Sequence, residues 1–242
     1  MTWFDLAIFL AAGFAGATAS VVGFGIGSLL TPLLATRFGI SAAVVAVTIP
    51  HALATAVRCW RLRGDIDRRV LVRFGLLSAA GALAGALLYT RLGSTALTRI
   101  LGGLLLLTAG AQLTGWSTRW RPHGPLVGLF GLLSGFFGGV AGNQGGLRAA
   151  ALTAFGLAPA AFVATATATG LLVDLARTPV YLSSSGVDLR FLAGPIGFAI
   201  AGVLLGTFLG ERILLGMSVG AFGRAVGIAI GLLGLWLLLG TA

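Results

Sequence analysis

The sequence predicts an all-α polytopic membrane protein, and three observations lead to that class. Of its 242 residues, 57% are hydrophobic and only 9% are charged, whereas a soluble domain carries about 25% charged residues. Apolar runs separated by arginine, proline and glycine recur along the whole chain. The 39 glycines suit close helix packing in lipid, where small residues allow the backbones to approach. We therefore expect one integral membrane domain.

Each half of the chain contains five apolar segments. A membrane-spanning helix needs roughly 17 to 25 residues, and the second segment of each half is shorter than that. Such a length favours a half-helix that turns back, so we expect the first two segments of each half to form a hairpin around a glycine break. The segments are about 3–22, 25–36, 40–57, 74–89 and 96–114 in the first half, and about 125–141, 145–155, 159–182, 189–209 and 217–239 in the second.

The two halves resemble each other in sequence. An offset of 119 residues places Gly16 on Gly135, Gly23 on Gly142 and Gly27 on Gly146. A slightly larger offset places Asp67 on Asp188, Gly81 and Gly85 on Gly202 and Gly206, and Arg91 on Arg212. This self-similarity predicts two repeats, residues 1–120 and 121–242. Because each holds five segments, the second enters the membrane from the opposite face, which makes the repeats inverted.

The arginines predict the orientation. All 16 basic residues are arginines, and the formal net charge is +10. In a soluble protein this balance would suggest nucleic-acid binding, but here the arginines lie mainly between apolar segments. The side that carries more of them is expected to face the cytoplasm. Both termini then lie outside the cytoplasmic membrane of a bacterial cell. The richer side receives Arg58, Arg61, Arg63, Arg68, Arg69, Arg73, Arg119, Arg121, Arg212 and Arg224, and the other receives Arg37, Arg91, Arg99, Arg177 and Arg190.

Two glycine-rich breaks are the candidate binding site. They lie in the stretches 16–32 and 134–148. Broken helix is tolerated at membrane depth only where protein or a water-filled cavity surrounds it, and such breaks in matching positions of two halves point to a transporter's binding site. We expect substrate contacts from backbone at Gly23, Gly25, Gly27, Gly142, Gly145 and Gly146.

Polar residues of the second half predict that the ligand is an anion. Arg148 follows the second break, and Asp174 and Arg177 are three residues apart on one helix face. Two arginines and one aspartate leave a net positive site, and guanidinium groups bind oxyanions in pairs of hydrogen bonds. We expect further contacts from Asn143, Gln144, Thr165 and Thr169. The alternative is that these residues are structural and hold helices together.

His51 and Asp174 are either proton-coupling or structural residues. A histidine titrates near neutral pH and can carry a proton, but a membrane histidine can equally be a hydrogen-bonded packing residue. No grouping of His, Cys, Asp and Glu has metal-ligand spacing, and no nucleotide or hydrolase motif occurs. We therefore expect no cofactor, no metal and no enzymatic activity. The remaining enzyme alternative is an intramembrane hydrolase built from His51 with Ser20 or Ser28.

The chain resembles the TauE/SafE sulfite exporter family over nearly its whole length. The residues that carry the resemblance are GFGIGSLLTPLL and AAVVAVTIP in the first half, and GGVAGNQGGLRAAAL and ATATATGLLVDLARTPVY in the second. Membership implies a permease for sulfite, thiosulfate, sulfonates or small carboxylates, driven by ion or proton gradients. Asn143, Gln144 and Arg148 depart from the plain glycine run of many members, which implies that the second half supplies most substrate contacts.

The sequence therefore predicts a secondary transporter of a small anion that works by alternating access. Its expected partners are the anion and the lipid bilayer, with protons or sodium as coupling ions and a homodimer as a further assembly, and without nucleic acid. The alternatives are an anion channel, a non-transporting membrane scaffold and an intramembrane enzyme.

Overall fold

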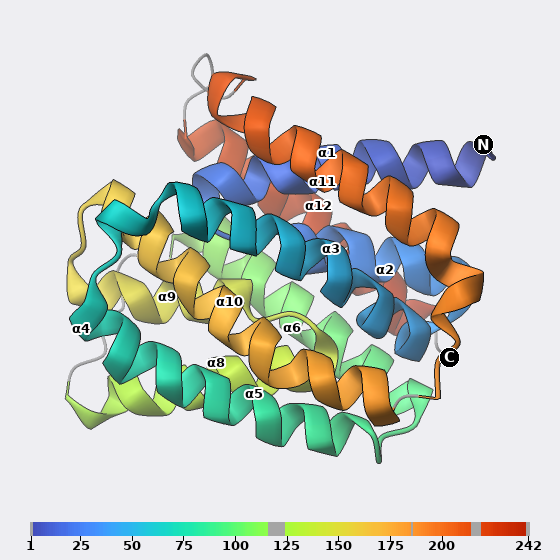
Figure 1. Ribbon diagram of the computed structural model, residues 1–242, viewed down its shortest axis with the longest axis horizontal. Coiled ribbons are helices and arrows are strands. Elements are labelled where there is room, and N and C mark those ends of the chain that lie inside the picture. The colour runs from blue at the N-terminus through green and yellow to red at the C-terminus, as the bar shows by residue number, and fades with distance from the viewer. Residues whose placement is uncertain (1, 116–123, 185, 214–218, 241–242) are drawn as a thin grey trace.

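The computed structural model describes residues 2–115, 124–184, 186–213 and 219–240, and within these ranges the chain is helical and contains no strand (Figure 1). The principal helices are α1 (Trp3–Val22), α2 (Ile26–Phe38), α3 (Ile40–Arg61), α4 (Arg68–Val70), α5 (Leu76–Tyr89), α6 (Ser94–Thr114), α8 (Pro125–Ala141), α9 (Gly145–Leu152), α10 (Pro159–Ser184), α11 (Ala193–Ile213) and α12 (Val219–Leu239). Short turns η1 (Arg63–Asp65), η3 (Thr153–Phe155) and η4 (Leu189–Leu192) and the π-helical turn η2 (Leu71–Gly75) connect or extend them.

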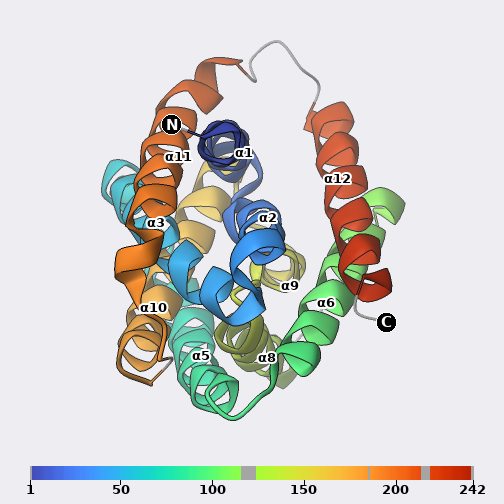
Figure 2. The same cartoon turned by 90° about the vertical axis from the view of Figure 1, so that its right-hand side faces the viewer.

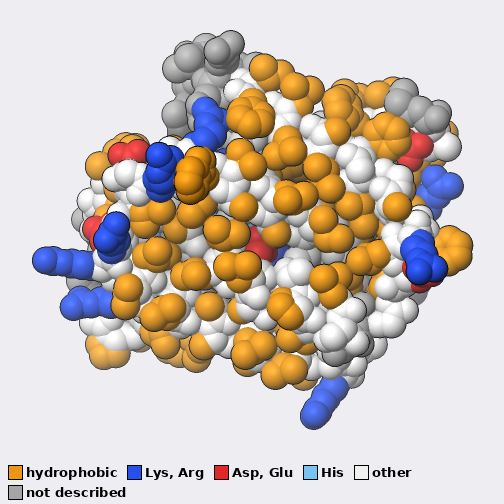
Figure 3. All heavy atoms as spheres, viewed as in Figure 1, with side chains coloured by type: hydrophobic (Ala, Val, Ile, Leu, Met, Phe, Trp, Pro, Cys, Tyr) orange, Lys and Arg blue, Asp and Glu red, His pale blue; other side chains and the backbone are white. Residues whose placement is uncertain are grey.

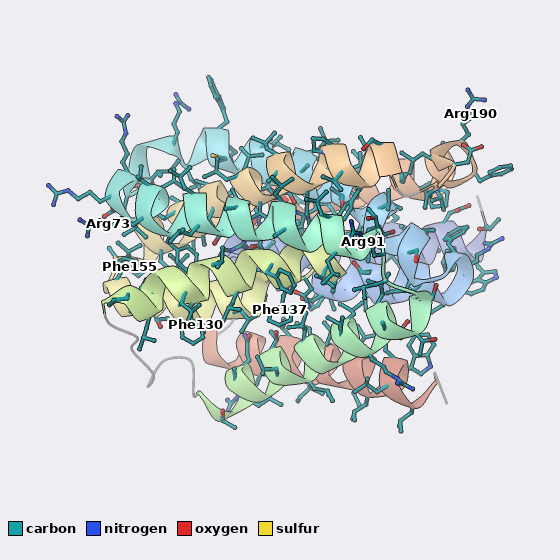
Figure 4. All side chains as sticks on the ribbon, turned by 90° about the horizontal axis from the view of Figure 1, so that it is seen from below. Arg73, Arg91, Phe130, Phe137, Phe155 and Arg190 are labelled. Atoms are coloured by element: carbon teal, nitrogen blue, oxygen red, sulfur yellow. The ribbon has the colours of Figure 1, made fainter. Side chains whose placement is uncertain are left out.

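Six helical stretches of the described chain are long and apolar enough to cross a membrane, which confirms the predicted fold class. They run roughly parallel to one another in Figure 1. Charged side chains gather at the two ends of the molecule, and a wide apolar band lies between them (Figure 3). Arg73 lies at one end and Arg190 at the other (Figure 4). The six stretches are Trp3–Val21, Ile40–Arg61, Arg68–Tyr89, Ser94–Thr114, Pro159–Ser183 and Leu189–Gly210.

The predicted segments match the helices closely, with one difference that matters for the site. The third segment was expected to end at Val57, with Arg58 in the following loop, but α3 continues to Arg61 and buries Arg58. The expectation was wrong because a charge does not by itself end a helix, and arginine is favourable in a last turn. The fourth predicted segment, 74–89, begins earlier than expected, because its helical stretch starts at Arg68. Arg119, Arg121 and the predicted start of the last segment at 217 lie outside the described residues.

Each half begins with a hairpin whose second arm is short. α1 has 20 residues and α2 has 13, whereas α8 has 17 and α9 has 8. Figure 2 shows α2 and α9 in the middle of the molecule, with α3, α10 and α11 on one side and α6 and α12 on the other. The start of α1 and the end of α12 lie at the same end of the molecule (Figure 1). The short helices are therefore enclosed by longer ones.

Glycines set the close packing of two helix pairs, α1 with α11 and α5 with α8. A β-carbon placed on Gly85 would overlap the carbonyl oxygen of Phe136, and one placed on Gly135 would overlap that of Ser78. A β-carbon placed on Gly206 would likewise overlap the carbonyl oxygen of Gly13. These backbones touch directly, which is the packing that small residues allow between helices in lipid.

Replacing Gly85 with alanine is expected to lower the free energy of unfolding by about 1–3 kcal/mol, because the added methyl group must push α5 and α8 apart. Gly103→Ala is the matched control, since Gly103 is exposed in the middle of α6 and nothing lies within 4 Å of an added β-carbon. That change should stabilise by about 0.5–1 kcal/mol through helix propensity alone. Thermal unfolding of both variants in detergent checks the difference, and equal effects would contradict the packing described above.

Candidate anion-binding site

The two hairpins meet at their glycine breaks. α1 ends at Gly23 (φ 83°) and α8 ends at Gly142 (φ 71°), and both glycines are left-handed, a conformation that glycine adopts without strain. A β-carbon on Gly27 would lie 2.6 Å from the carbonyl oxygen of Gly142. Across the same contact, Ser28 Oγ donates to Asn143 Oδ1 at 3.1 Å. The starts of α2 and α9 therefore face each other inside the protein.

Arg148 lies one turn into α9 and is only 3% exposed. Its Nη2 donates to the carbonyl oxygen of Gly23 at 3.0 Å, which links the second break to the first. Nη1 lies against α10, 2.8 Å from where a β-carbon of Gly170 would be. Nε and Nη1 have no hydrogen-bond partner although both are buried. Two nitrogens of one guanidinium, which carry three N–H groups, are thus available inside the protein.

Arg177 is buried as well, but each of its three nitrogens has a partner. Nε and Nη2 donate to Asp174 Oδ1 at 3.1 and 2.8 Å, and Nη1 donates to the carbonyl oxygen of Gly138 at 2.6 Å. That carbonyl belongs to the last turn of α8, where a cation is favourable, and it also accepts the backbone N–H of Gly142 at 3.0 Å. Tyr181 Oη donates to the neighbouring carbonyl of Gly139. Arg177 and Tyr181 therefore hold α10 against the end of α8.

The other oxygen of the same carboxylate contacts His51. Asp174 Oδ2 lies 2.6 Å from His51 Nδ1, and the imidazole is 12% exposed. Thr55, one turn further along α3, lies 3.4 Å from the same ring nitrogen. Asp174 thus joins α10 to α3, and its two oxygens contact the Arg177 guanidinium and the His51 imidazole.

The amide pair of the second break lies inside the protein with unused hydrogen-bonding atoms. Asn143 and Gln144 are each 4% exposed. Nδ2 of Asn143 and both amide atoms of Gln144 lack a partner. Gln144 packs against Gly138, and Phe24 covers Gly145. The unused amide donors therefore lie in the same break as Arg148.

Positive charge prevails among the described buried residues. The buried charged side chains are Arg58, Arg148, Arg177 and Asp174, so three positive charges face one negative charge when His51 is neutral. A charge inside a membrane protein is expensive and is normally paired or functional. An interior with two excess positive charges is suited to bind an anion.

The structure separates the predicted threonines. Thr165 accepts a hydrogen bond from the backbone N–H of Asp67 at 2.9 Å, so it fixes the turn before α4. Thr169 lies near Gly75, on the side of α10 that faces η2. Thr167 shares a helix face with Gly170 by its spacing of three residues, and its buried hydroxyl has no partner. The hydroxyl of Thr169 is also buried without a partner, so the two share this property and Thr165 does not.

Two predicted glycines also face other elements. A β-carbon on Gly25 would contact Thr18 of α1, and one on Gly146 would overlap Thr108 of α6. Gly25 nevertheless starts α2, with φ 133°. These glycines shape and pack the breaks without facing Arg148.

Sequence reasoning missed Arg58, which it counted among the loop arginines. The structure buries it to 4% exposure in the last turn of α3. The spacing of His51, Thr55 and Arg58, four and then three residues apart, places all three on one helix face. That helical spacing was the signal in the sequence that could have found it.

The fold and these buried groups define a multi-pass helical membrane protein with a positively charged interior. Residues 8–237 match the family described as "Sulfite exporter TauE/SafE". The chain belongs to this family of membrane transporters of sulfite and related anions, which confirms the predicted resemblance. No curated protein and no solved structure matches the chain.

Proposed function

We propose that this protein is a secondary transporter that moves a small anion, such as sulfite, thiosulfate, a sulfonate or a small organic anion, across the cytoplasmic membrane. The observation that carries the proposal is the buried guanidinium of Arg148 with two unpartnered nitrogens at the meeting point of the breaks. A buried charge without a partner is strongly unfavourable. An oxyanion would supply the missing acceptors and the missing charge.

The groups around Arg148 suggest how the anion is held. One of the two unpartnered nitrogens, Nε or Nη1, donates to an oxygen of the anion, and the second N–H of Nη2, which lies beside it and is not used on Gly23, can complete a pair. The amide groups of Asn143 and Gln144 donate from the break itself. Backbone N–H groups at the starts of α2 and α9 add positive dipole, because the first N–H groups of a helix are unpaired. In this proposal Arg177 and Asp174 position the end of α8.

Alternating access by two inverted repeats is supported by a difference between the helix pairs. At the repeat offsets, Gly81 corresponds to Gly202, and Leu132 corresponds to Gly13. A β-carbon on Gly81 would overlap the carbonyl oxygen of Leu132, yet one on Gly202 would overlap that of Phe9, four residues before Gly13. The packing register of α1 against α11 therefore differs by four residues from that of α8 against α5.

A second set of contacts gives the same shift. Gly135 approaches the carbonyl of Ser78, and the residues that correspond to these two are Gly16 and residue 199. Gly16, however, approaches the carbonyl of Val203, which is four residues further along α11. Four residues are one helical turn, about 6 Å along the axis. Packed helices are known to move past one another by one-turn steps. We infer that the two pairs exchange their registers when the site opens to the opposite side of the membrane.

The proposed orientation has the Arg61–Arg73 end in the cytoplasm and both termini outside. Arg58 and Arg177 are buried within α3 and α10, so they no longer count among the arginines that flank the membrane. The bias then changes from ten against five to nine against four and keeps its sign. His51 is the proposed coupling group, since its ring lies on Asp174 and can gain or lose a proton at its second nitrogen. The charged groups that act on it electrostatically are Asp174, which it contacts, and Arg177 and Arg148.

Counterflow in proteoliposomes distinguishes this carrier from an anion channel. Vesicles preloaded with unlabelled sulfite should accumulate labelled sulfite transiently, because an alternating-access site exchanges one anion for another. A channel dissipates the gradient without such exchange. An imposed pH gradient should change the rate for the wild type and not for His51→Gln. Flux without counterflow would favour the channel, and the absence of flux for every anion of the proposed class would favour a scaffold.

A further inference from the structure

Arg58 differs from the other arginines that the structure describes at its end of the molecule. Its neighbours Arg61 and Arg63 are exposed, whereas Arg58 is 4% exposed. Its Nε and Nη1 are buried and have no hydrogen-bond partner. Arg63, by contrast, donates to the carbonyl of Trp60 and lies over its ring. Arg58 therefore has the unsatisfied donors of a ligand-binding group rather than the solvated state of an orientation signal.

Thr55, which lies one turn before Arg58 on α3, and the side chain of Arg148 approach the same part of α10. Thr55, three residues before Arg58 on the same face of α3, has its methyl group 3.6 Å from the β-carbon position of Gly170. Arg148 Nη1 is 2.8 Å from that position. Any side chain at residue 170 would occupy the space where this nitrogen lies. The glycine thus lets a guanidinium from α9 reach the α3–α10 interface, next to the turn that bears Arg58.

The charge balance at this interface is uneven. Asp174 is the one acid among the described buried residues, and Arg177 and His51 occupy its two oxygens. Arg58 lies one turn after Thr55, which meets Arg148 at Gly170, so the like charges of the two buried arginines repel each other. A monovalent anion would leave one of these two charges uncompensated, whereas a divalent anion would balance both.

We propose that Arg58 and Arg148 together bind a divalent oxyanion, so that Arg58 is a substrate-binding residue contributed by the first half of the chain. This inference rests on the proposed transport function and narrows its substrate class to anions that carry two negative charges. The two arginines come from α3 and α9, so the site joins the two halves of the chain. Monovalent sulfonates and carboxylates of similar size are then poor ligands.

The test is anion binding to purified protein in detergent at pH 8.5, measured by thermal unfolding and by calorimetry. The divalent probes are sulfite, sulfate and thiosulfate, and the monovalent probes are methanesulfonate and acetate. The wild type should bind at least one divalent probe about tenfold or more tightly than either monovalent probe. Arg58→Gln should weaken that binding by about 30-fold or more, the effect expected for removing one partner of a buried charge pair. The preference for divalent over monovalent anions should disappear with it.

Two variants make the result specific. Arg58→Lys keeps the charge and should retain much of the preference, and Arg69→Gln removes an exposed charge at the same end and should change nothing. If the wild type binds monovalent probes equally well, or if Arg58→Gln keeps the preference, the inference is overturned while the transport proposal stands. If no anion binds the wild type, the proposed function fails and this inference fails with it. Unfolding of Arg58→Gln without ligand reports whether the variant is folded, and Arg58→Lys tests the inference if it is not.

Discussion

Arg148→Gln is expected to abolish anion binding and transport without lowering the stability of the unliganded protein. The anion loses a guanidinium in a buried site, and removing one partner of such a pair costs about 2–5 kcal/mol, or roughly 30-fold or more in affinity. The free protein loses one hydrogen bond, from Nη2 to Gly23. It also loses a buried charge whose other two nitrogens have no partner, and that relief offsets the lost bond.

Thermal unfolding with and without sulfite checks both parts of this expectation. A ligand present at a hundred times its dissociation constant stabilises the native state by about 2.7 kcal/mol, so the wild type should shift upward and the variant should not. Arg148→Lys is the control: it keeps the charge and can reach Gly23, but it lacks the planar fork, so its affinity should fall between the two. A variant that melts well below the wild type yet still responds to sulfite would show that Arg148 is structural.

Much of the fold could be predicted from the sequence because the membrane imposes strong constraints. A span must be long and apolar, so hydropathy located α1, α6 and α8 almost to the residue. The glycine breaks were predictable for the same reason, since Gly23 and Gly142 interrupt runs that would otherwise continue as helix. The pairing of Asp174 with Arg177 followed from their spacing of three residues.

The parts of the site that were missed depend on tertiary contacts or on helical phase. The sequence treated the threonines as a set, but an α-helix turns by 100° per residue, so Thr165 and Thr169 share one face and Thr167 lies on another. Arg58 was assigned to a loop because it begins an arginine-rich stretch. Charge alone cannot separate an orientation signal from a buried arginine; the helical spacing of Arg58 from His51 and Thr55 points to burial, and the packing of α3 shows it.

The sequence could not have shown either that each guanidinium nitrogen of Arg177 has a hydrogen-bond partner. Its third nitrogen binds the carbonyl of Gly138 from a helix 39 residues away in sequence. This contact turns a residue that resembled a ligand-binding arginine into one that joins α10 to α8. Arg148 and Arg177 look equivalent in sequence, but two nitrogens of Arg148 have no partner, whereas each nitrogen of Arg177 has one.

Asp174→Asn is expected to lower the stability of the unliganded protein, whereas Arg148→Gln is not. It removes the charge that balances Arg177 in a site where both side chains are almost fully buried, at 1% exposure each. Breaking a buried ion pair by removing one partner costs about 3–5 kcal/mol, because an uncompensated charge remains inside. His51 also loses the carboxylate on its Nδ1. The free energy of unfolding in detergent should therefore fall by that amount.

The double variant Asp174→Asn with Arg177→Gln separates the ion pair from other effects. It removes both charges at once and leaves two amides that can hydrogen-bond to each other and to Gly138, so it should recover most of the stability lost in the single variant. His51→Gln, which leaves the Asp174–Arg177 pair intact, should cost much less than Asp174→Asn. If Asp174→Asn melts like the wild type, the carboxylate does not hold a buried arginine, and the link between α10 and the end of α8 must come from Tyr181 instead.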